Sequence, residues 1–295
     1  MSNKTLVLGF ADYAAPGERL ARELGAPFAQ VELHRFPDGE SKLTLPATLP
    51  EQVVICRSLD HPNDKLVELL LCAETARQLG AKRLTLVAPY LCYMRQDIAF
   101  HPGEAVSQQI IGAFLAHHFD AVITVDPHLH RISQLSEAIP RGAAITLSAT
   151  PLMAQFIAER TVRPLLVGPD AESEQWVRAI AEPAGLDFAV ANKERLGDRL
   201  VRTTLPERDY AGRHVVLVDD MASTGHTLMT VASQLAQRGA RAIDCLVTHA
   251  LFADDATQQL HEAGIGNIWS SDTIIHPSNV ITLAPLLAAA VRRLH

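Results

Sequence analysis

The sequence is poor in cysteine and has no long apolar run. Its 295 residues include only four cysteines, Cys56, Cys72, Cys92 and Cys245, scattered without the spacing of metal ligands. We interpret them as buried free thiols of a protein in a reducing compartment. No apolar run approaches the length of a membrane-spanning helix, so we expect a cytoplasmic protein without a membrane partner.

The chain also lacks an excess of positive charge. It has 26 Lys and Arg against 33 Asp and Glu, a formal net charge of −7. This balance argues against a general nucleic-acid binder, which usually carries a basic stripe. Anionic small molecules stay possible, because a few local bases or Mg²⁺ can invert the field within a cleft. The first ten residues, MSNKTLVLGF, contain one lysine before a short apolar run and indicate a first strand, not a signal peptide.

Strand and helix patterns alternate along the whole chain, which predicts α/β folding with parallel sheets flanked by helices. The length favours two domains. A hinge is expected near Pro140–Ser148, after which the pattern restarts. We therefore expect a first domain of residues 1–143 and a second of 144–283, followed by a helix, 284–294, with Arg292 and Arg293 in its last turn.

The segment HVVLVDDMASTGHTLM, residues 214–229, joins a strand pattern to a helix pattern through a short polar loop. The strand is mostly β-branched or apolar, as in a sheet buried on both faces, and Asp219 and Asp220 are expected at its carboxyl end. Loop N–H groups and a helix N-terminus attract phosphate, and paired acids bind ribose hydroxyls directly or through a divalent cation. The alternative is an ordinary turn whose acids cap the helix. No Gly-Lys-Ser/Thr sequence follows a strand, so this is not the glycine-lysine phosphate loop.

Two polar clusters follow strand patterns in the first half. Arg95 and Gln96 offer a guanidinium that can hold phosphate oxygens and an amide that can contact a base or ribose. Asp126 and His128 stand at a strand end, where open α/β sheets bind ligands. Taken alone, the first cluster is better explained as a surface loop with a salt bridge, and the second is explained equally well as a capping Asp and a loop His.

The second half has two similar candidates. Asp170 ends a strand pattern and is a candidate ligand for Mg²⁺ or a nucleotide. Lys193 and Arg195 open a polar connector, residues 192–213, of the length at which active-site lids occur. The alternative for this pair is solvated surface.

Taken in order, these motifs resemble those of the ribose-phosphate diphosphokinases, or phosphoribosyl diphosphate (PRPP) synthetases. The resemblance covers nearly the whole chain and includes the turn FPDGE, residues 36–40. It implies ATP contacts for Phe36, Asp38, Glu40, Arg95 and Gln96; Mg²⁺ ligation by Asp126, His128 and Asp170; catalytic roles for Lys193, Arg195 and His128; and ribose 5-phosphate contacts for Asp219, Asp220, Ala222, Ser223, Thr224, Gly225, His226 and Thr227.

The chain departs from the common form of that family. Its Ser223-Thr224-Gly225 loop and its run 103–107, GEAVS, are more similar to the archaeal-type (class III) branch. His226 stands where that branch usually has glycine. Residues 98–102 lack the basic cluster of the common form, so activation by phosphate and inhibition by ADP are not implied.

The resemblance implies two phosphoribosyltransferase-like domains, with the last helix returning to the first. Residues 1–143 plus 284–295 would form the ATP side, and 144–283 would carry the ribose 5-phosphate loop. Such an enzyme uses Mg²⁺ to transfer diphosphate from ATP to the 1-hydroxyl of ribose 5-phosphate, releasing AMP. A shared site would make it a homo-oligomer, a dimer or tetramer. The alternatives are a phosphoribosyltransferase, a catalytically silent regulatory subunit of a PRPP synthetase, and an α/β binding protein without catalysis.

Overall fold

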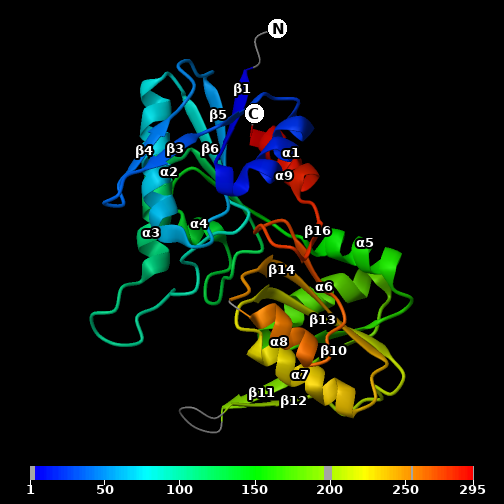
Figure 1. The fold of residues 1–295 in the computed structure, drawn as a ribbon. Helices are drawn as coiled ribbons and strands as arrows, with labels where there is room; N and C mark the ends of the chain where they lie inside the picture. Colours follow the sequence, from blue (N-terminus) through cyan, green and yellow to red (C-terminus); the bar gives the residue numbers. More distant parts are fainter. Residues whose placement is uncertain (1–3, 196–200, 254, 295) are drawn as a thin grey trace. The chain divides into compact units, whose positions relative to one another are not determined.

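Apolar runs in the first half of the chain form a parallel six-stranded sheet in the computed structural model (Figure 1), which describes residues 4–195, 201–253 and 255–294. The strand order is β2-β1-β5-β6-β7-β8. Its core strands are almost entirely buried, as expected where helices cover a parallel sheet. The strands are β1 (Thr5–Gly9), β2 (Phe28–Gln30), β5 (Gln52–Cys56), β6 (Arg83–Val87), β7 (Ala121–Val125) and β8 (Ala143–Leu147).

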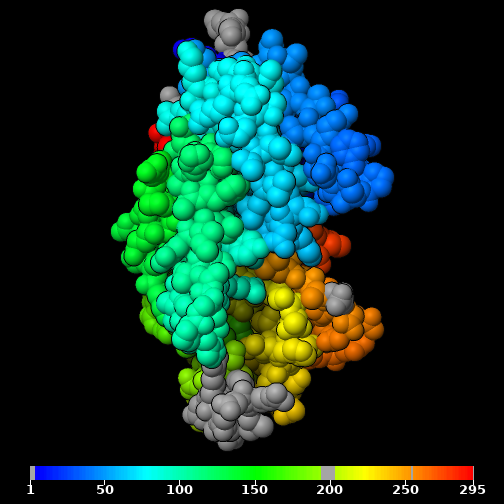
Figure 2. Space-filling model, turned by 90° about the vertical axis from the view of Figure 1, so that its left-hand side faces the viewer, coloured from blue at the N-terminus to red at the C-terminus, as the bar shows by residue number. Residues whose placement is uncertain are grey.

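Helices and one hairpin complete this first unit. The hairpin β3–β4 lies on its surface, coloured blue in Figure 2, and the last helix packs against α1, as Figure 1 shows. The expected return of the C-terminal helix is thus present. The elements are η1 (Ala11–Tyr13), α1 (Ala14–Leu24), β3 (Glu32–Arg35), β4 (Ser41–Thr44), α2 (Pro62–Gln78), α3 (Ser107–His118), α4 (Leu135–Ala138) and α9 (Ala284–Leu294).

The second unit repeats the architecture. Its six-stranded parallel sheet has the order β10-β9-β13-β14-β15-β16, and β11 and β12 form a separate antiparallel hairpin (Figure 1). The elements are α5 (Thr150–Arg160), β9 (Leu165–Gly168), η2 (Ala171–Ser173), α6 (Glu174–Ala184), β10 (Phe188–Val190), β11 (Asn192–Arg195), β12 (Val201–Thr204), β13 (His214–Ala222), α7 (His226–Gln237), β14 (Ala242–Ala250), α8 (Ala256–Glu262), β15 (Ile268–Ser271) and β16 (Asn279–Ile281). The predicted fold class, two α/β domains with parallel sheets flanked by helices, is confirmed.

The boundary between the units differs from the expected one. The first unit consists of the chain up to Leu147, the segment Thr273–Ile275 and the chain from Thr282 onward. The second unit consists of Ser148–Asp272 and His276–Ile281. A division after residue 143 would cut β8, which pairs with β7 along its length. The break after Leu147 falls within the stretch 140–148 in which a hinge was expected. The strand β8 in that stretch was not predicted, because the breakers Pro140, Gly142 and Ser148 flank it.

The polar connector 192–213 also differs from the expectation of a loop. Asn192–Arg195 pairs antiparallel with Val201–Thr204, and residues 196–200 lie outside the described part. A two-stranded hairpin needs no continuous apolar run, so its polar sequence gave no strand signal. Residues 28–35 likewise form two short strands, β2 and the exposed β3.

All four cysteines are buried free thiols, as expected. Burial raises the pKa of Cys72 and of Cys92 to about 12, and it also raises the pKa of Cys245. Because the thiolate is the reactive form, we expect the folded protein at pH 8 to react with a thiol reagent such as DTNB only after denaturant exposes its thiols. Rapid labelling of the native protein would contradict this burial. Among the described residues no helix is both long enough and apolar enough to cross a bilayer.

Candidate active site

The acid pair lies within β13, because this strand continues four residues beyond Val218. Successive side chains of a strand point to opposite faces, and the two acids differ accordingly. Asp219 is half-buried, whereas Asp220 is only 3% exposed. The backbone N–H of Asp220 donates to Oδ1 of Asp219 at 2.9 Å. The acids therefore follow the buried run of the strand, as expected, although the strand itself is longer than predicted.

The short loop after β13 encloses a cavity of about 110 Å³ at the N-terminus of α7. Gly225 is the N-cap of that helix and has φ 72°, a left-handed conformation that suits glycine. His226 is already the first helical residue, so the left-handed turn falls on Gly225 and His226 needs no glycine-like geometry. The lining residues are Asp219, Met221, Ala222, Ser223, Thr224, Gly225, His226, Thr227 and Leu228. All the predicted ribose 5-phosphate contacts except Asp220 thus line one cavity.

Negative charge gathers beside this cavity. Burial raises the pKa of Asp219 well above its usual range, and the neighbouring carboxylates of Asp220 and Asp170 raise it further. Asp170 follows β9, the strand that pairs with β13 through Leu165 to Val167, so both acids reach the same edge of the sheet. Such a group of acids favours a cation or a hydroxyl-rich ligand.

Asp170 has two partners. Its Oδ1 accepts the N–H groups of Glu172 at 3.1 Å and Ser173 at 3.3 Å, which caps η2. Its Oδ2 lies 3.6 Å from Nζ of Lys193. The capping role was missed from the sequence, although Asp170 and Ser173 have the spacing of a capping box. The predicted metal ligand therefore already neutralises one of the predicted catalytic cations.

Lys193 and Arg195 both belong to β11, where Lys193 is opposite Thr203 and Arg195 is opposite Val201. The side chain of Arg195 lies outside the described part of the structure. Lys193 is thus placed beside Asp170, and Arg195 is placed only by its backbone.

In the first unit, the turn 36–40 closes the hairpin β3–β4. Phe36 donates its N–H to the carbonyl of Glu40 at 2.8 Å, and Asp38 Oδ1 accepts the N–H of Glu40 at 3.1 Å. Phe36 is 40% exposed, with its ring edge-on to His34 at 4.8 Å between centroids. The turn presents an aromatic face and two carboxylates to the outside of this unit.

The loops after β6 and β7 are tied together. Asp97, which is 7% exposed, pairs with Arg131 at 2.6 Å. This ion pair joins the stretch that holds Arg95 and Gln96 to the loop that follows Asp126. Arg95 is exposed, and the Gln96 side chain donates to the carbonyl of Ile98 at 2.9 Å. Two of the predicted motifs are therefore brought side by side within this unit.

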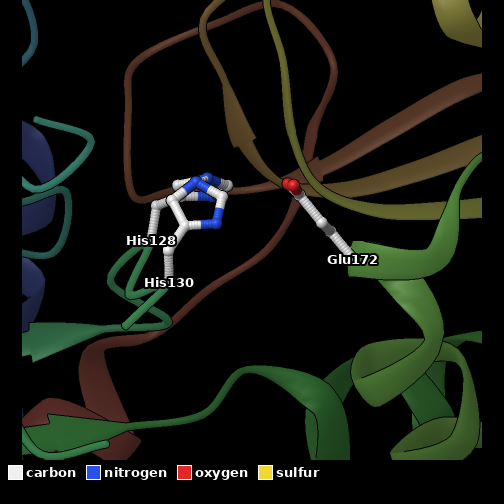
Figure 3. A group of neighbouring side chains, drawn as sticks. All are labelled: His128, His130 and Glu172. Carbon is white, nitrogen blue, oxygen red and sulfur yellow. Dashed lines mark hydrogen bonds between the residues drawn. The ribbon is translucent and has the colours of Figure 1, made fainter. Parts of the chain in front are cut away.

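Asp126 and His128 follow β7 as expected. Asp126 is buried and has φ 39°, a left-handed conformation uncommon outside glycine and tolerated by aspartate. Nε2 of His128 lies 2.6 Å from Nε2 of His130, and the two rings meet edge to face (Figure 3). Glu172, also drawn in Figure 3, belongs to η2 of the second unit. His130, which was not among the predicted site residues, is thus the direct partner of His128.

A buried ion network near the base of the hairpin β3–β4 was also missed. Glu68 on α2 has 0% exposure and Arg57 after β5 has 4%, and Arg57 NH2 lies 2.7 Å from Glu68 Oε2. Leu70, two residues further along α2, is only half-buried although it is apolar. An acid directly before the three leucines Leu69 to Leu71 was the available signal, but this pattern does not distinguish a buried acid from an exposed one.

Comparisons with known proteins agree with this geometry. A family model described as the N-terminal domain of ribose phosphate pyrophosphokinase matches residues 8–118, and a phosphoribosyl transferase domain model matches residues 136–281. The ribose-phosphate pyrophosphokinase of Methanopyrus kandleri is 35% identical over 292 residues, covering 98% of this chain and 99% of that protein. The ribose-phosphate pyrophosphokinase of Saccharolobus solfataricus is 32% identical over 285 residues, covering 94% and 96%. The solved structure of phosphoribosylpyrophosphate synthetase from Mycobacterium smegmatis has the same fold, with a TM-score of 0.85, 23% identity and coverage of 99% and 98%. The chain is therefore an enzyme of the ribose-phosphate pyrophosphokinase family.

Proposed function

We propose that this chain transfers a diphosphate group from ATP to the 1-hydroxyl of ribose 5-phosphate, with Mg²⁺ as its cofactor, giving PRPP and AMP. The observation that carries the proposal is the cavity at the N-terminus of α7, lined by eight of the nine residues from Asp219 to Thr227. Membership of the ribose-phosphate pyrophosphokinase family supports the reaction type. The finer assignments of substrate contacts rest on the residues described above.

Ribose 5-phosphate is assigned to this cavity. Its volume of about 110 Å³ is smaller than the roughly 300–1,000 Å³ of pockets that enclose a drug-sized ligand, so it suits the phosphate end alone. The N–H groups of the first turn of α7 and the hydroxyls of Ser223, Thr224 and Thr227 would donate to the phosphate. The carboxylates of Asp219 and Asp220 would accept the 2- and 3-hydroxyls of the ribose.

The phosphoryl chemistry needs orientation and positive charge. The ribose 1-hydroxyl oxygen attacks the β-phosphorus of ATP, the bond between that phosphorus and the α–β bridging oxygen breaks, AMP leaves, and the hydroxyl proton is released. Lys193 and Arg195 would stabilise the negative charge on the phosphate oxygens. Lys193 stands close to the sugar site through its 3.6 Å contact with Asp170, which supports this role.

The donor atoms present also fit Mg²⁺, which prefers carboxylate oxygens. The raised pKa of Asp219, caused partly by Asp220 and Asp170, indicates carboxylates whose mutual repulsion a cation would relieve. Asp170 therefore suits the metal in the second unit, and Asp126 offers a carboxylate in the first. His128 has a nitrogen donor and is better suited to a phosphate oxygen. When bound, Mg²⁺ supplies neutralisation of the phosphate charge.

The nucleotide is assigned to the first unit. Phe36 offers a half-exposed ring for stacking on adenine, with Asp38 and Glu40 as acceptors for its amino group. Arg95 and Gln96 would contact the phosphates and the sugar or base. These assignments follow the family resemblance residue by residue.

We also propose that the protein is a homo-oligomer, a dimer or tetramer, in which the turn 36–40 enters a neighbouring subunit's site. Exposed apolar side chains on the hairpin and on α2 support this: Leu33, Phe36, Val67 and Leu71 are 39%, 40%, 57% and 37% exposed. Clustered apolar exposure of this kind is typical of association surfaces. Sedimentation of the purified protein with and without ATP measures the assembly.

The first experiment is a coupled assay of AMP and PRPP formation from ATP, Mg²⁺ and ribose 5-phosphate, with and without inorganic phosphate. PRPP formation in both tubes supports the proposed reaction and the archaeal-type assignment. Formation only with added phosphate keeps the reaction and moves the chain towards the common form of the family. No product in either tube, with both ligands still bound, would overturn the proposal in favour of a silent regulatory subunit.

A further inference from the structure

The hairpin that carries the turn 36–40 is held by a carboxylate with no exposure to solvent. Glu68 on α2 is 0% exposed, although its neighbour in sequence, Val67, is 57% exposed. An ionised carboxylate removed from water is destabilising unless partners compensate for the lost hydration. The partners of Glu68 therefore reveal which parts of the first unit it connects.

One side of the network fixes Glu68 to the strand ends of the sheet. Arg57, directly after β5, places NH2 2.7 Å from Glu68 Oε2. The same guanidinium lies 3.9 Å from the centroid of the Phe10 ring and donates from Nε to Asp12 at 3.2 Å, and both of these residues follow β1. Glu68 is thereby joined to two neighbouring strands of the parallel sheet.

The other side holds the base of the turn. Glu68 Oε1 accepts hydrogen bonds from Arg35 NH2 at 3.0 Å and from Ser41 Oγ at 3.1 Å. Arg35 is the last residue of β3, Ser41 is the first of β4, and the two are partners in the hairpin register. One carboxylate oxygen therefore bonds both residues that immediately flank the turn.

We propose that Glu68 is a positioning residue for nucleotide recognition. It fixes the base of the turn 36–40 to the sheet, so that Phe36, Asp38 and Glu40 meet adenine in one orientation, whether in their own subunit or in a neighbour. Glu68 itself touches no substrate. This inference rests on the proposed adenine contacts. It predicts that the affinity for ATP depends on the network, whereas the affinity for ribose 5-phosphate does not.

The test compares steady-state constants for both substrates in Arg35→Gln, Ser41→Ala and Glu68→Gln. Each variant removes one or more bonds between the carboxylate and the turn. Glu68→Gln also leaves the buried Arg57 with Asp12 as its counter-charge in place of two carboxylates, and it is the variant at risk of not folding. Arg35 is half-exposed and Ser41 is partly buried, so their variants decide the matter if Glu68→Gln does not fold.

We expect the KM for ATP to rise about tenfold in Arg35→Gln and less in Ser41→Ala. The charged donor Arg35 makes the stronger of the two hydrogen bonds to Glu68. The KM for ribose 5-phosphate and the kcat at saturating ATP should change by less than about twofold, because a misplaced turn weakens binding and leaves the reacting groups intact. Calorimetric binding of a non-hydrolysable ATP analogue should weaken in parallel, which gives a readout independent of turnover.

Glu74→Gln is the matched control, because Glu74 lies on the same helix but pairs with His118, away from the hairpin. It should leave both KM values unchanged. Equal increases in the two KM values, or an unchanged KM for ATP in Arg35→Gln and Ser41→Ala, would overturn the inference. A wild-type protein that forms no PRPP would instead refute the proposed function, so the two failures are distinguishable.

Discussion

Replacing Lys193 or Arg195 with alanine should lower turnover by roughly 10³-fold or more, while ribose 5-phosphate binds nearly as before. Both side chains are proposed to stabilise charge that is concentrated on the phosphates during transfer, and a group that acts mainly in the transition state affects kcat more than binding. Among the described side chains, Lys193 does not line the cavity at the N-terminus of α7. The measurement pairs the kcat of each variant with its calorimetric Kd for ribose 5-phosphate.

Arg178→Ala is the control for this experiment. Arg178 is an exposed cation of the same unit, on α6, bridged to Glu174 and Glu182. Exposed bridges of this type contribute at most about 1 kcal/mol, so its loss should leave turnover unchanged. If Lys193→Ala and Arg195→Ala weakened ribose 5-phosphate binding as much as they lowered kcat, their assignment to the transition state would be wrong.

Asp219→Asn should weaken ribose 5-phosphate binding and, at neutral pH, stabilise the unliganded protein. A hydrogen bond to a charged group contributes about 1.5–3 kcal/mol, so its loss corresponds to roughly 10- to 100-fold in affinity. The gain in stability follows from the raised pKa of Asp219, which reflects burial and the nearby carboxylates of Asp220 and Asp170. The asparagine oxygen can still accept the N–H of Asp220.

The stability effect depends on pH. The folded state holds the Asp219 proton more tightly than the unfolded chain does. The stabilisation that protonated Asp219 contributes is therefore fully present below the pKa of Asp219 in the unfolded chain, about 3.9. It is lost as the pH rises through the pKa of Asp219 in the folded protein. Thermal melts of wild type and Asp219→Asn across this range should separate as the pH rises, with the variant higher. A lower melting temperature for the variant at pH 7 would refute the charge-repulsion account.

Much of the fold followed from apolar runs in the sequence. The strands β5, β6, β7 and β13 are largely buried apolar runs, so hydrophobicity alone indicated the alternation of strands and helices. The hairpins β3–β4 and β11–β12 were harder to predict because exposed two-stranded pairs carry no apolar run. The strand β8 was missed since the breakers around it, including Gly142 with φ 74°, dominate its short sequence.

The candidate site could be proposed from the sequence where its residues lie close together in the chain. The residues from Asp219 to Thr227 form one loop, and the structure gathers them around one cavity. Pairings between distant residues were not predictable, because nothing in the sequence relates Glu68 to Arg57 or Lys193 to Asp170. Whether a charged side chain is buried depends on how helices and strands pack against one another. A single sequence does not specify that packing.

Because the four native thiols are buried, the protein is well suited to site-specific labelling for spectroscopy. A cysteine introduced at an exposed position would be the sole rapidly labelled thiol, without prior removal of the native ones. Ile110 of the first unit and Val162 of the second are 59% and 92% exposed. Paired probes at these two positions, in a background otherwise unaltered, would report in real time how far the two halves of the enzyme move as each substrate binds.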